Sequence, residues 1–335
     1  MEPAFRKFSL QTALRTGLPS LRYYLTRPAL PASDRLPLFT MNILPPMGRV
    51  WYHFARKHLG DQVDITIFDC SGRLNPAHFP GATVQPFINL YASAKSDEFL
   101  YHIARNRTHG WICDDDVFFV SGESLKVLER EFAVPNTATV SLRARKWWEF
   151  DIDGQPHPVS GSYSIAFDRQ IFCDKEKLSL APADGNTHNR SLNGKPLTRY
   201  DTGDLSNELL LRRGYRCYVS PDDESKRCLA SFSGLSGAVI LLWLYKTPEE
   251  VLAYLTDPPK EAWGGTMLFG ILSAMLAIWT IQDLHAEIFG APYHLPTLPP
   301  REKLQALAAE VTPFLPKELS FQWVEDVRQQ LFAAL

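Results

Sequence analysis

The sequence lacks any paired-cysteine motif and any excess of one charge. Its five cysteines are scattered, odd in number and without a Cys-x-x-Cys pair. This argues against a zinc site or a disulfide framework and favours a reducing compartment. The 35 basic and 37 acidic side chains give a formal net charge of −2, so no global positive field attracts nucleic acid. We therefore expect no nucleic-acid partner.

The amino terminus also lacks a recognisable cleavable signal peptide, which predicts a cytoplasmic protein. Residues 1–36 instead form a basic segment. Residues 1–30 carry five Arg and Lys residues against a single acid, Glu2, with Phe, Leu and Tyr interleaved. This pattern predicts an amphipathic helix packed on the next domain. The alternative is a peripheral membrane segment whose basic surface rests on anionic lipid at the inner face of a membrane.

Strand-like and helix-like segments alternate from residue 37 to residue 120. Apolar alternation predicts strands at 38–44, 63–68 and 84–90 and a fourth that enters Asp114, with helices at 48–59 and 96–107. This order is typical of a parallel sheet with crossover helices. Ligands of such sheets bind beyond the carboxyl ends of the strands, where Asp69 and the acids after the fourth strand should lie.

Three consecutive carboxylates, Asp114, Asp115 and Asp116, separate two strongly apolar runs. Three like charges buried within a strand would be very costly, so the acids must emerge at a strand end. A turn there would let Asp114 and Asp116 converge on Mg²⁺ or Mn²⁺ while Asp115 points elsewhere. The alternative is a solvated acidic turn or a helix cap.

The next hundred residues predict a second, more irregular half. A helix is expected at 124–132, with strands at 138–142 and 162–167. Trp147 and Trp148 should face opposite sides of a strand, one in the core and the other free to stack on a sugar or to pack as well. Residues 182–200 are dense in Asp, Asn, Gly and Pro, which predicts a long mobile loop. Asp201 and Asp204 then precede a helix at 205–213.

After residue 221 the chain becomes helical and apolar. Residues 264–281 contain 18 positions without a charge, near the lower limit of a membrane span. Small residues at helical spacing favour a buried helix, or a homo-oligomer interface, over a span. Further helices are expected at 301–314 and 317–333. The chain thus divides into a basic segment (1–36), a central domain (37–220, with halves 37–120 and 121–220) and a helical region (221–335).

The order of these features resembles the GT-A glycosyltransferases over residues 37–220. The features are an apolar strand ending in Asp114–Asp116, a glycine-containing strand at 161–164, and an acid that opens a helix ending Arg-Arg-Gly-Tyr. The resemblance implies an α/β, Rossmann-like GT-A fold with a mostly parallel central sheet flanked by helices, plus a helical C-terminal appendage. It also implies a hexosyltransferase-like enzyme (EC 2.4). Such an enzyme transfers sugar from a nucleoside-diphosphate donor to a glycan, lipid or protein acceptor.

The same resemblance implies roles for individual acids. Asp116 would ligate Mn²⁺ or Mg²⁺ bridging the donor diphosphate. Asp114 would contact the metal or the ribose. Asp115 would belong to the same nucleotide site, the Asp-x-Asp (DXD) motif of the family. Asp69 would hold the base or ribose, unless it only forms a turn in Asp-Cys-Ser-Gly. A UDP-sugar donor is favoured over a GDP-sugar.

On the acceptor side, the resemblance makes Asp204 the general base of an inverting reaction, with Asp201 as the alternative. A plain helix N-cap is the competing interpretation of Asp204. The late histidine that completes the metal site in many members of the family has no clear counterpart here, so no histidine is assigned as a ligand.

Two other classes remain open at this stage. A nucleotidyltransferase also combines a Rossmann-like half with metal-binding acids. It would favour a glycine-rich basic loop after the first strand, whereas Leu44 to Arg49 contains only one Gly and one Arg. A non-catalytic, membrane-associated scaffold is the third class, in which the acids only decorate the surface.

Overall fold

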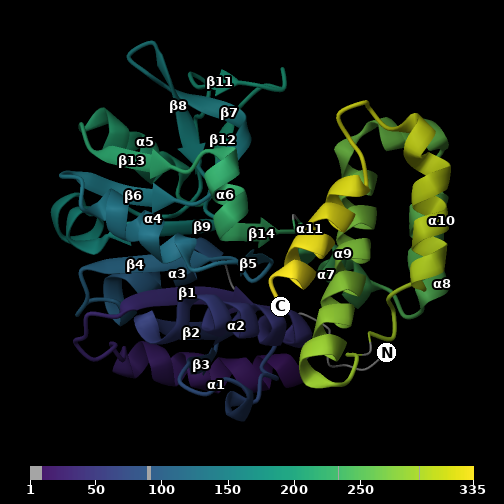
Figure 1. Ribbon diagram of the computed structural model, residues 1–335, viewed down its shortest axis with the longest axis horizontal. Coiled ribbons are helices and arrows are strands. Elements are labelled where there is room, and N and C mark those ends of the chain that lie inside the picture. The colour runs from purple at the N-terminus through teal and green to yellow at the C-terminus, as the bar shows by residue number, and fades with distance from the viewer. Residues whose placement is uncertain (1–9, 89–91, 233, 294) are drawn as a thin grey trace.

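The computed structural model describes residues 10–88, 92–232, 234–293 and 295–335. A seven-stranded sheet in the order β13-β6-β9-β4-β1-β2-β3 forms its centre (Figure 1). Strand β9 runs antiparallel to both β4 and β6, and every other pairing in the sheet is parallel. The predicted α/β fold with a mostly parallel sheet is confirmed. The strands are β1 (Leu36–Asn42), β2 (Val63–Asp69), β3 (Thr83–Pro86), β4 (His109–Cys113), β6 (Thr137–Ser141), β9 (Ser164–Asp168) and β13 (Arg216–Val219).

Both faces of this sheet are buried because apolar side chains alternate between them. Leu38 and Trp111 belong to one core, and their neighbours Phe39 and Ile112 belong to the other. The first core is covered by α2 (Pro45–Leu59) and α4 (Glu123–Phe132). The second is covered by α1 (Leu10–Thr26), by α3 (Ala92–Glu98) with its π-helical turn Phe99–Ile103, and by α5 (Asp204–Arg212).

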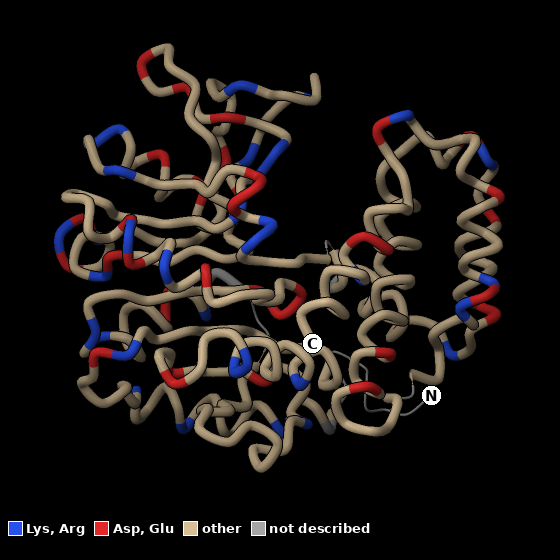
Figure 2. The backbone as a smooth tube through the Cα atoms, in the orientation of Figure 1, with Lys and Arg blue, Asp and Glu red and all other residues tan. Residues whose placement is uncertain are grey.

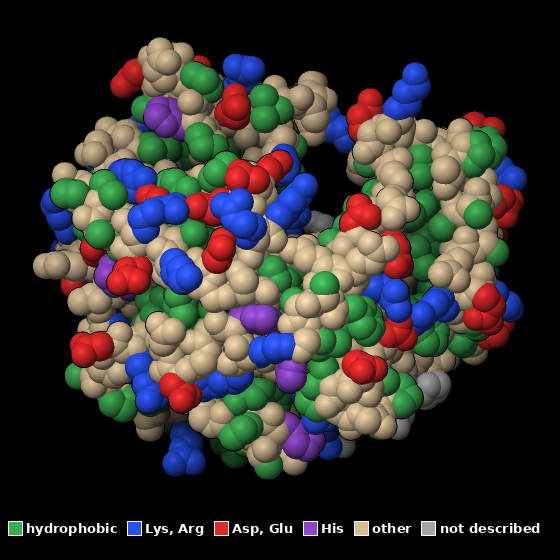
Figure 3. All heavy atoms as spheres, viewed as in Figure 1, with side chains coloured by type: hydrophobic (Ala, Val, Ile, Leu, Met, Phe, Trp, Pro, Cys, Tyr) green, Lys and Arg blue, Asp and Glu red, His purple; other side chains and the backbone are tan. Residues whose placement is uncertain are grey.

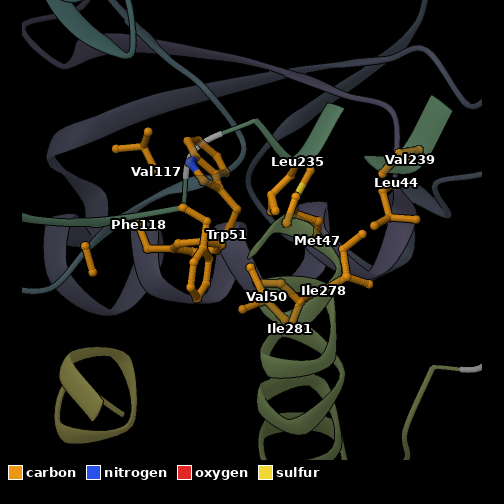
Figure 4. Packing of buried hydrophobic residues seen from close by; sticks show 14 of the residues in the cluster. Leu44, Met47, Val50, Trp51, Val117, Phe118, Leu235, Val239, Ile278 and Ile281 are labelled. Atoms are coloured by element: carbon orange, nitrogen blue, oxygen red, sulfur yellow. The ribbon is translucent and has the colours of Figure 1, made fainter. Parts of the chain in front are cut away.

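The C-terminal helices extend the first core. Strand β14 (Leu229–Ser231) pairs antiparallel with β5 (Val117–Phe119) and leads the chain into these helices. Figure 4 shows side chains of α2, β5, α7 and α9 meeting in one apolar cluster. Helix α6 (Asp222–Cys228) precedes β14. The helices after β14 are α7 (Leu235–Leu244), α8 (Pro248–Thr256), α9 (Thr266–Phe289), α10 (Arg301–Val311) and α11 (Gln322–Ala333).

Helix α9 is long and apolar enough to cross a membrane, but 67% of its apolar window is buried inside the protein. In Figure 4 its residues Ile278 and Ile281 lie beside Val50 of α2. The interpretation of residues 264–281 as a buried helix agrees with this packing. The oligomer interface stays a prediction.

A smaller antiparallel sheet stands beyond the central one. It joins β7 (Ala144–Ile152), β8 (Gln155–Ser160) and β11 (Arg190–Ser191). Figure 3 shows a hollow between this part and the C-terminal helices. Figure 2 shows acidic and basic residues interspersed over both parts, which matches the small net charge.

The segment 182–200, predicted to be a long mobile loop, contains three strands of two residues each. Strand β10 (Ala183–Asp184) pairs with β12 (Arg199–Tyr200), and β11 pairs with β7. Asn189 is buried and donates to Glu208 Oε2 at 2.8 Å, while Tyr200 Oη donates to the same oxygen at 2.7 Å. Hydrogen bonds between buried polar side chains fix this segment, so the small number of apolar residues in its sequence did not reveal these contacts.

Candidate active site

The three acids emerge in a tight turn at the carboxyl end of β4, as the sequence predicts. Cys113 is the last residue of β4, and the main-chain N–H of Asp114 donates to Tyr163 O at 2.8 Å. The N–H of Val117 then donates to Asp114 O at 3.2 Å, which closes the turn before β5. Buried strands on both sides therefore hold the turn in place.

Within this turn the carboxylates separate into different environments. Asp114 is exposed, Asp116 is half-buried, and Asp115 is buried. Asp115 Oδ2 accepts a hydrogen bond from Asn42 Nδ2 at 2.7 Å. Asp115 therefore points away from the opening, as expected for the middle acid. Its proposed contact with a nucleotide would require Asn42 to release it.

The protein environment disfavours the charged forms of Asp114 and Asp116. Desolvation by the surrounding protein and repulsion from Asp116 raise the pKa of Asp114 well above its ordinary value, although Arg145 and Arg143 oppose the shift. Desolvation also raises the pKa of Asp116 to about 6, against the influence of Arg143 and of the Leu235 N–H. Because each acid makes the other harder to ionise, a bound cation would stabilise both.

These two acids fit a hard dication that also binds substrate. Among the residues that the structure describes, no three His, Cys, Asp or Glu side chains converge to hold an ion by themselves. Mg²⁺ commonly binds through one or two carboxylates together with substrate phosphates and water. Asp114 and Asp116 match that donor set, and a diphosphate would complete it.

Asp114 shares a pocket with the turn that precedes α5. The pocket has a volume of 210 Å³, and Asp114, Ser162, Tyr163 and Asp201 are among its lining residues. Asp201 also lines a second pocket of 260 Å³, together with Arg145, Trp147 and Asp204. The fold thus brings one predicted donor-side acid, Asp114, and one predicted acceptor-side acid, Asp201, to the same pocket. Asp201 is the residue that connects the two pockets.

Arg145 of β7 is a functional candidate that the sequence reasoning missed. It is 4% exposed, and its Nη1 lies 3.2 Å from Asp201 Oδ2 while its Nη2 lies 3.3 Å from Asp204 Oδ1. Its guanidinium also lies 4.9 Å from the Trp147 ring centroid. The alternation of Arg145 with Trp147 on one strand face was the available signal. In the described structure its Nε finds no hydrogen-bond partner.

Asp201 and Asp204 differ sharply in accessibility. Asp204 is 1% exposed, and its Oδ2 accepts from the Asp201 N–H at 3.0 Å. Burial raises the pKa of Asp204 to about 6, and Arg145 opposes the shift. The side chain of Asp201 is 63% exposed. Asp204 therefore stabilises the turn by accepting a main-chain hydrogen bond, while the carboxylate of Asp201 is accessible from outside.

Asp69 is occupied by its own turn. Its Oδ1 accepts from the N–H and hydroxyl of Ser71 at 3.0 and 2.5 Å and from the Gly72 N–H at 3.0 Å. Its Oδ2 accepts from the Leu74 N–H at 2.9 Å. Gly72 has a φ of +65°, which favours glycine. The turn-forming interpretation explains Asp69, and contact with a nucleotide stays a prediction.

The two tryptophans face opposite sides of β7, as predicted. Trp148 is 2% exposed and packs against Phe150 and Tyr200, whereas Trp147 is 42% exposed. Gly161 permits a close approach within the chain itself. A Cβ atom at that position would lie 2.5 Å from the Tyr163 ring and 2.6 Å from Arg143 O.

Known structures resemble this chain at low sequence identity. No protein-family model matches the sequence, and no curated protein matches it. Among solved structures, the mannosyltransferase PcManGT from Pyrobaculum calidifontis, in complex with GDP-Man and Mn²⁺, aligns with 96% of this chain and 95% of its own. The identity is 14% and the TM-score is 0.40. The bifunctional glycosyltransferase WbbM aligns with 44% of this chain and 34% of its own, at 14% identity and a TM-score of 0.31. Similarity at this level transfers no function to this chain.

Proposed function

We propose that the protein is a metal-dependent glycosyltransferase that moves a sugar from a nucleoside-diphosphate donor to an acceptor hydroxyl. One observation carries the proposal. Two carboxylates with raised pKa values, Asp114 and Asp116, stand at the carboxyl end of β4, and Asp114 lines the same pocket as Asp201. More specifically, we propose that the transferred sugar is a hexose and that its donor is a UDP-sugar.

On the donor side, Asp114 and Asp116 would hold Mn²⁺ or Mg²⁺. When bound, the cation neutralises the charge that grows on a departing diphosphate. Arg143 and Arg145 add fixed positive charge near the same place, because both stabilise the ionised form of Asp114. The protein would therefore supply two anions, Asp114 and Asp116, to hold the metal, and two cations, Arg143 and Arg145, to add positive charge near it.

On the acceptor side, a carboxylate must take the proton of the attacking hydroxyl if the reaction inverts. The resemblance assigns this role to Asp204, but exposure favours Asp201 because a base must reach its proton. We propose Asp201 as the group that touches the acceptor. Asp204 would then act as a positioning residue that holds Arg145 and the turn.

The alternatives have less support. A nucleotidyltransferase would need a free cation after β1, but Arg49 lies 3.8 Å from the Phe289 ring centroid and its Nη1 is 3.3 Å from His285 Nε2. A scaffold with decorative acids would not need Asp114 and Asp116 in a protein environment that disfavours their charge.

Calorimetric titration with UDP- and GDP-sugars, with and without Mn²⁺, tests the proposal. We expect one sugar nucleotide to bind, and to bind only when the metal is present. The variant Asp115→Asn, at the neighbouring position, should bind the same sugar nucleotide with an affinity within a few fold of the native value. Failure of every sugar nucleotide to bind would refute it. Binding of a nucleoside triphosphate with release of pyrophosphate would instead identify a nucleotidyltransferase.

A further inference from the structure

Helix α1 packs on the protein with its polar face inward. It lies along β3 at the edge of the sheet (Figure 1). Thr12, Thr16, Ser20 and Tyr23 are buried. The opposite face exposes five leucines at helical spacing: Leu10 (77%), Leu14 (69%), Leu18 (74%), Leu21 (57%) and Leu25 (78%). The amphipathic helix expected in this segment therefore packs on the domain, and it does so through its polar face.

Specific contacts fix this orientation. Within the helix, Thr16 Oγ1 donates to Thr12 O at 2.8 Å and Ser20 Oγ donates to Thr16 O at 2.6 Å, so the hydroxyls on the buried face have partners. Ser20 Oγ also accepts from the Ile88 N–H at 2.9 Å. The Tyr23 ring packs edge-on against Phe68. Rotating the helix to bury its leucines would break the bond to Ile88 and expose Tyr23, so the leucine face is held outward.

The charges beside the leucines are all positive. Residues 10–27 contain no Asp or Glu, and Arg15, Arg22 and Arg27 are exposed. Arg15 and Arg22 directly follow Leu14 and Leu21, so they lie about 100° around the helix, on one flank of the leucine stripe. The sequence before the helix adds Arg6 and Lys7. The surface that covers this face should therefore be apolar inside and anionic at its rim.

We propose that α1 docks the protein in the plane of an anionic lipid bilayer. The five leucines enter the boundary of the acyl chains, and the arginines extend to the lipid phosphates. A second copy of the chain fits less well, because a paired α1 would bring arginines together without any acid on the helix to neutralise them. The proposal does not depend on the catalytic assignment.

Sedimentation of the full chain with vesicles tests the proposal. The probes are vesicles of phosphatidylcholine alone and of phosphatidylcholine mixed equally with phosphatidylglycerol. We expect binding to the anionic vesicles that weakens with salt. The double variant Leu14→Ser/Leu21→Ser should lower the binding constant at least tenfold, and Arg15→Gln/Arg22→Gln should remove the preference for the anionic lipid.

A matched control changes exposed apolar residues elsewhere. Leu244 on α7 and Met267 on α9 are 71% and 66% exposed, so Leu244→Ser/Met267→Ser should leave vesicle binding unchanged. Circular dichroism verifies that each variant is folded. Absence of binding by the native chain, or binding that survives loss of the leucines, would overturn the proposal. So would a dimer, measured by light scattering, that the leucine variant abolishes while vesicles do not bind.

Discussion

The turns after β2 and β4 begin with the same residue type at the same edge of the sheet, but they differ in what their carboxylates contact. Asp69 accepts hydrogen bonds from Ser71, Gly72 and Leu74. Asp114 is exposed in a pocket and repelled by Asp116. The carboxylate of one turn is satisfied by its own chain, whereas the proposed function gives the other turn an external cation. Position at a strand end therefore does not by itself identify a binding residue.

The turn before α5 repeats this contrast within four residues. Asp204 is buried and bonded to the main chain, while Asp201 is exposed to both pockets. In both turns, an acid whose oxygens accept hydrogen bonds from its own turn is structural, whereas an acid without such donors is available to a substrate.

The largest effect should come from Asp201→Asn. Loss of a general base lowers turnover by about 10²- to 10⁴-fold, and donor affinity should change little. Asp204→Asn should lower turnover less, because it removes a group that positions Arg145. Steady-state kinetics of the two variants provide the measurement. A greater loss in Asp204→Asn would restore Asp204 as the base and break the rule.

The second largest effect should come from Asp116→Asn. The amide can still accept from the Leu235 N–H but cannot offer a charge to a cation. We expect metal-dependent donor affinity to fall on the order of 100-fold, with an unchanged circular dichroism spectrum. Calorimetry measures the affinity, and Asp115→Asn is the matched neighbour. Equal donor binding by native protein and Asp116→Asn would remove the metal role of this acid.

The turn after β2 should respond in stability instead. Asp69→Ala leaves several turn donors without an acceptor, so it should lower the free energy of unfolding by about 3 kcal/mol. Asp114→Asn should change it by less than about 1 kcal/mol or raise it, since repulsion from Asp116 disappears. Urea unfolding measures the free energy of unfolding of both variants, and the comparison requires that their m-values be equal. Equal destabilisation by the two variants would contradict the distinction between the turns.

The smallest effect is a pH dependence of stability from Asp204. Its pKa is raised from 3.8 to about 6 in the folded protein, so the folded state binds the proton more tightly than the unfolded state. Its contribution to stability is therefore full at low pH and is lost as pH rises from about 4 through about 6, by on the order of 2 kcal/mol. This loss should be absent in Asp204→Asn. A constant difference in unfolding free energy between native protein and variant across this range would be the contrary result.

Much of the fold could be predicted from local pattern. Leu38 and Phe39 alternate between two cores, and such alternation, followed by helices of clear period, predicted the strands and helices of the sheet. The pattern failed where polar contacts decide. Asn189 and Glu208 order the segment 182–200 across the chain, and Ser20 sets the inward face of α1. Amphipathicity shows that a helix has two faces but does not show which face is covered.

The site could be predicted only in part. Three adjacent acids between apolar runs had to leave the sheet, and the cost of burying charge was enough to place Asp114 to Asp116. Arg145 could not be found this way, because a lone arginine acquires its role only when β7 brings it beside Asp201 and Asp204. The burial of Asp204 likewise depends on tertiary packing.

The central claim is that Asp114 and Asp116 hold a dication together with the donor diphosphate. Anomalous scattering at the manganese edge, from a crystal soaked with sugar nucleotide and Mn²⁺, tests it most directly. We predict one manganese peak within about 2.0–2.6 Å of an oxygen of Asp116 and in contact with the diphosphate. A nucleotide bound at the site with no manganese beside these acids would contradict the account.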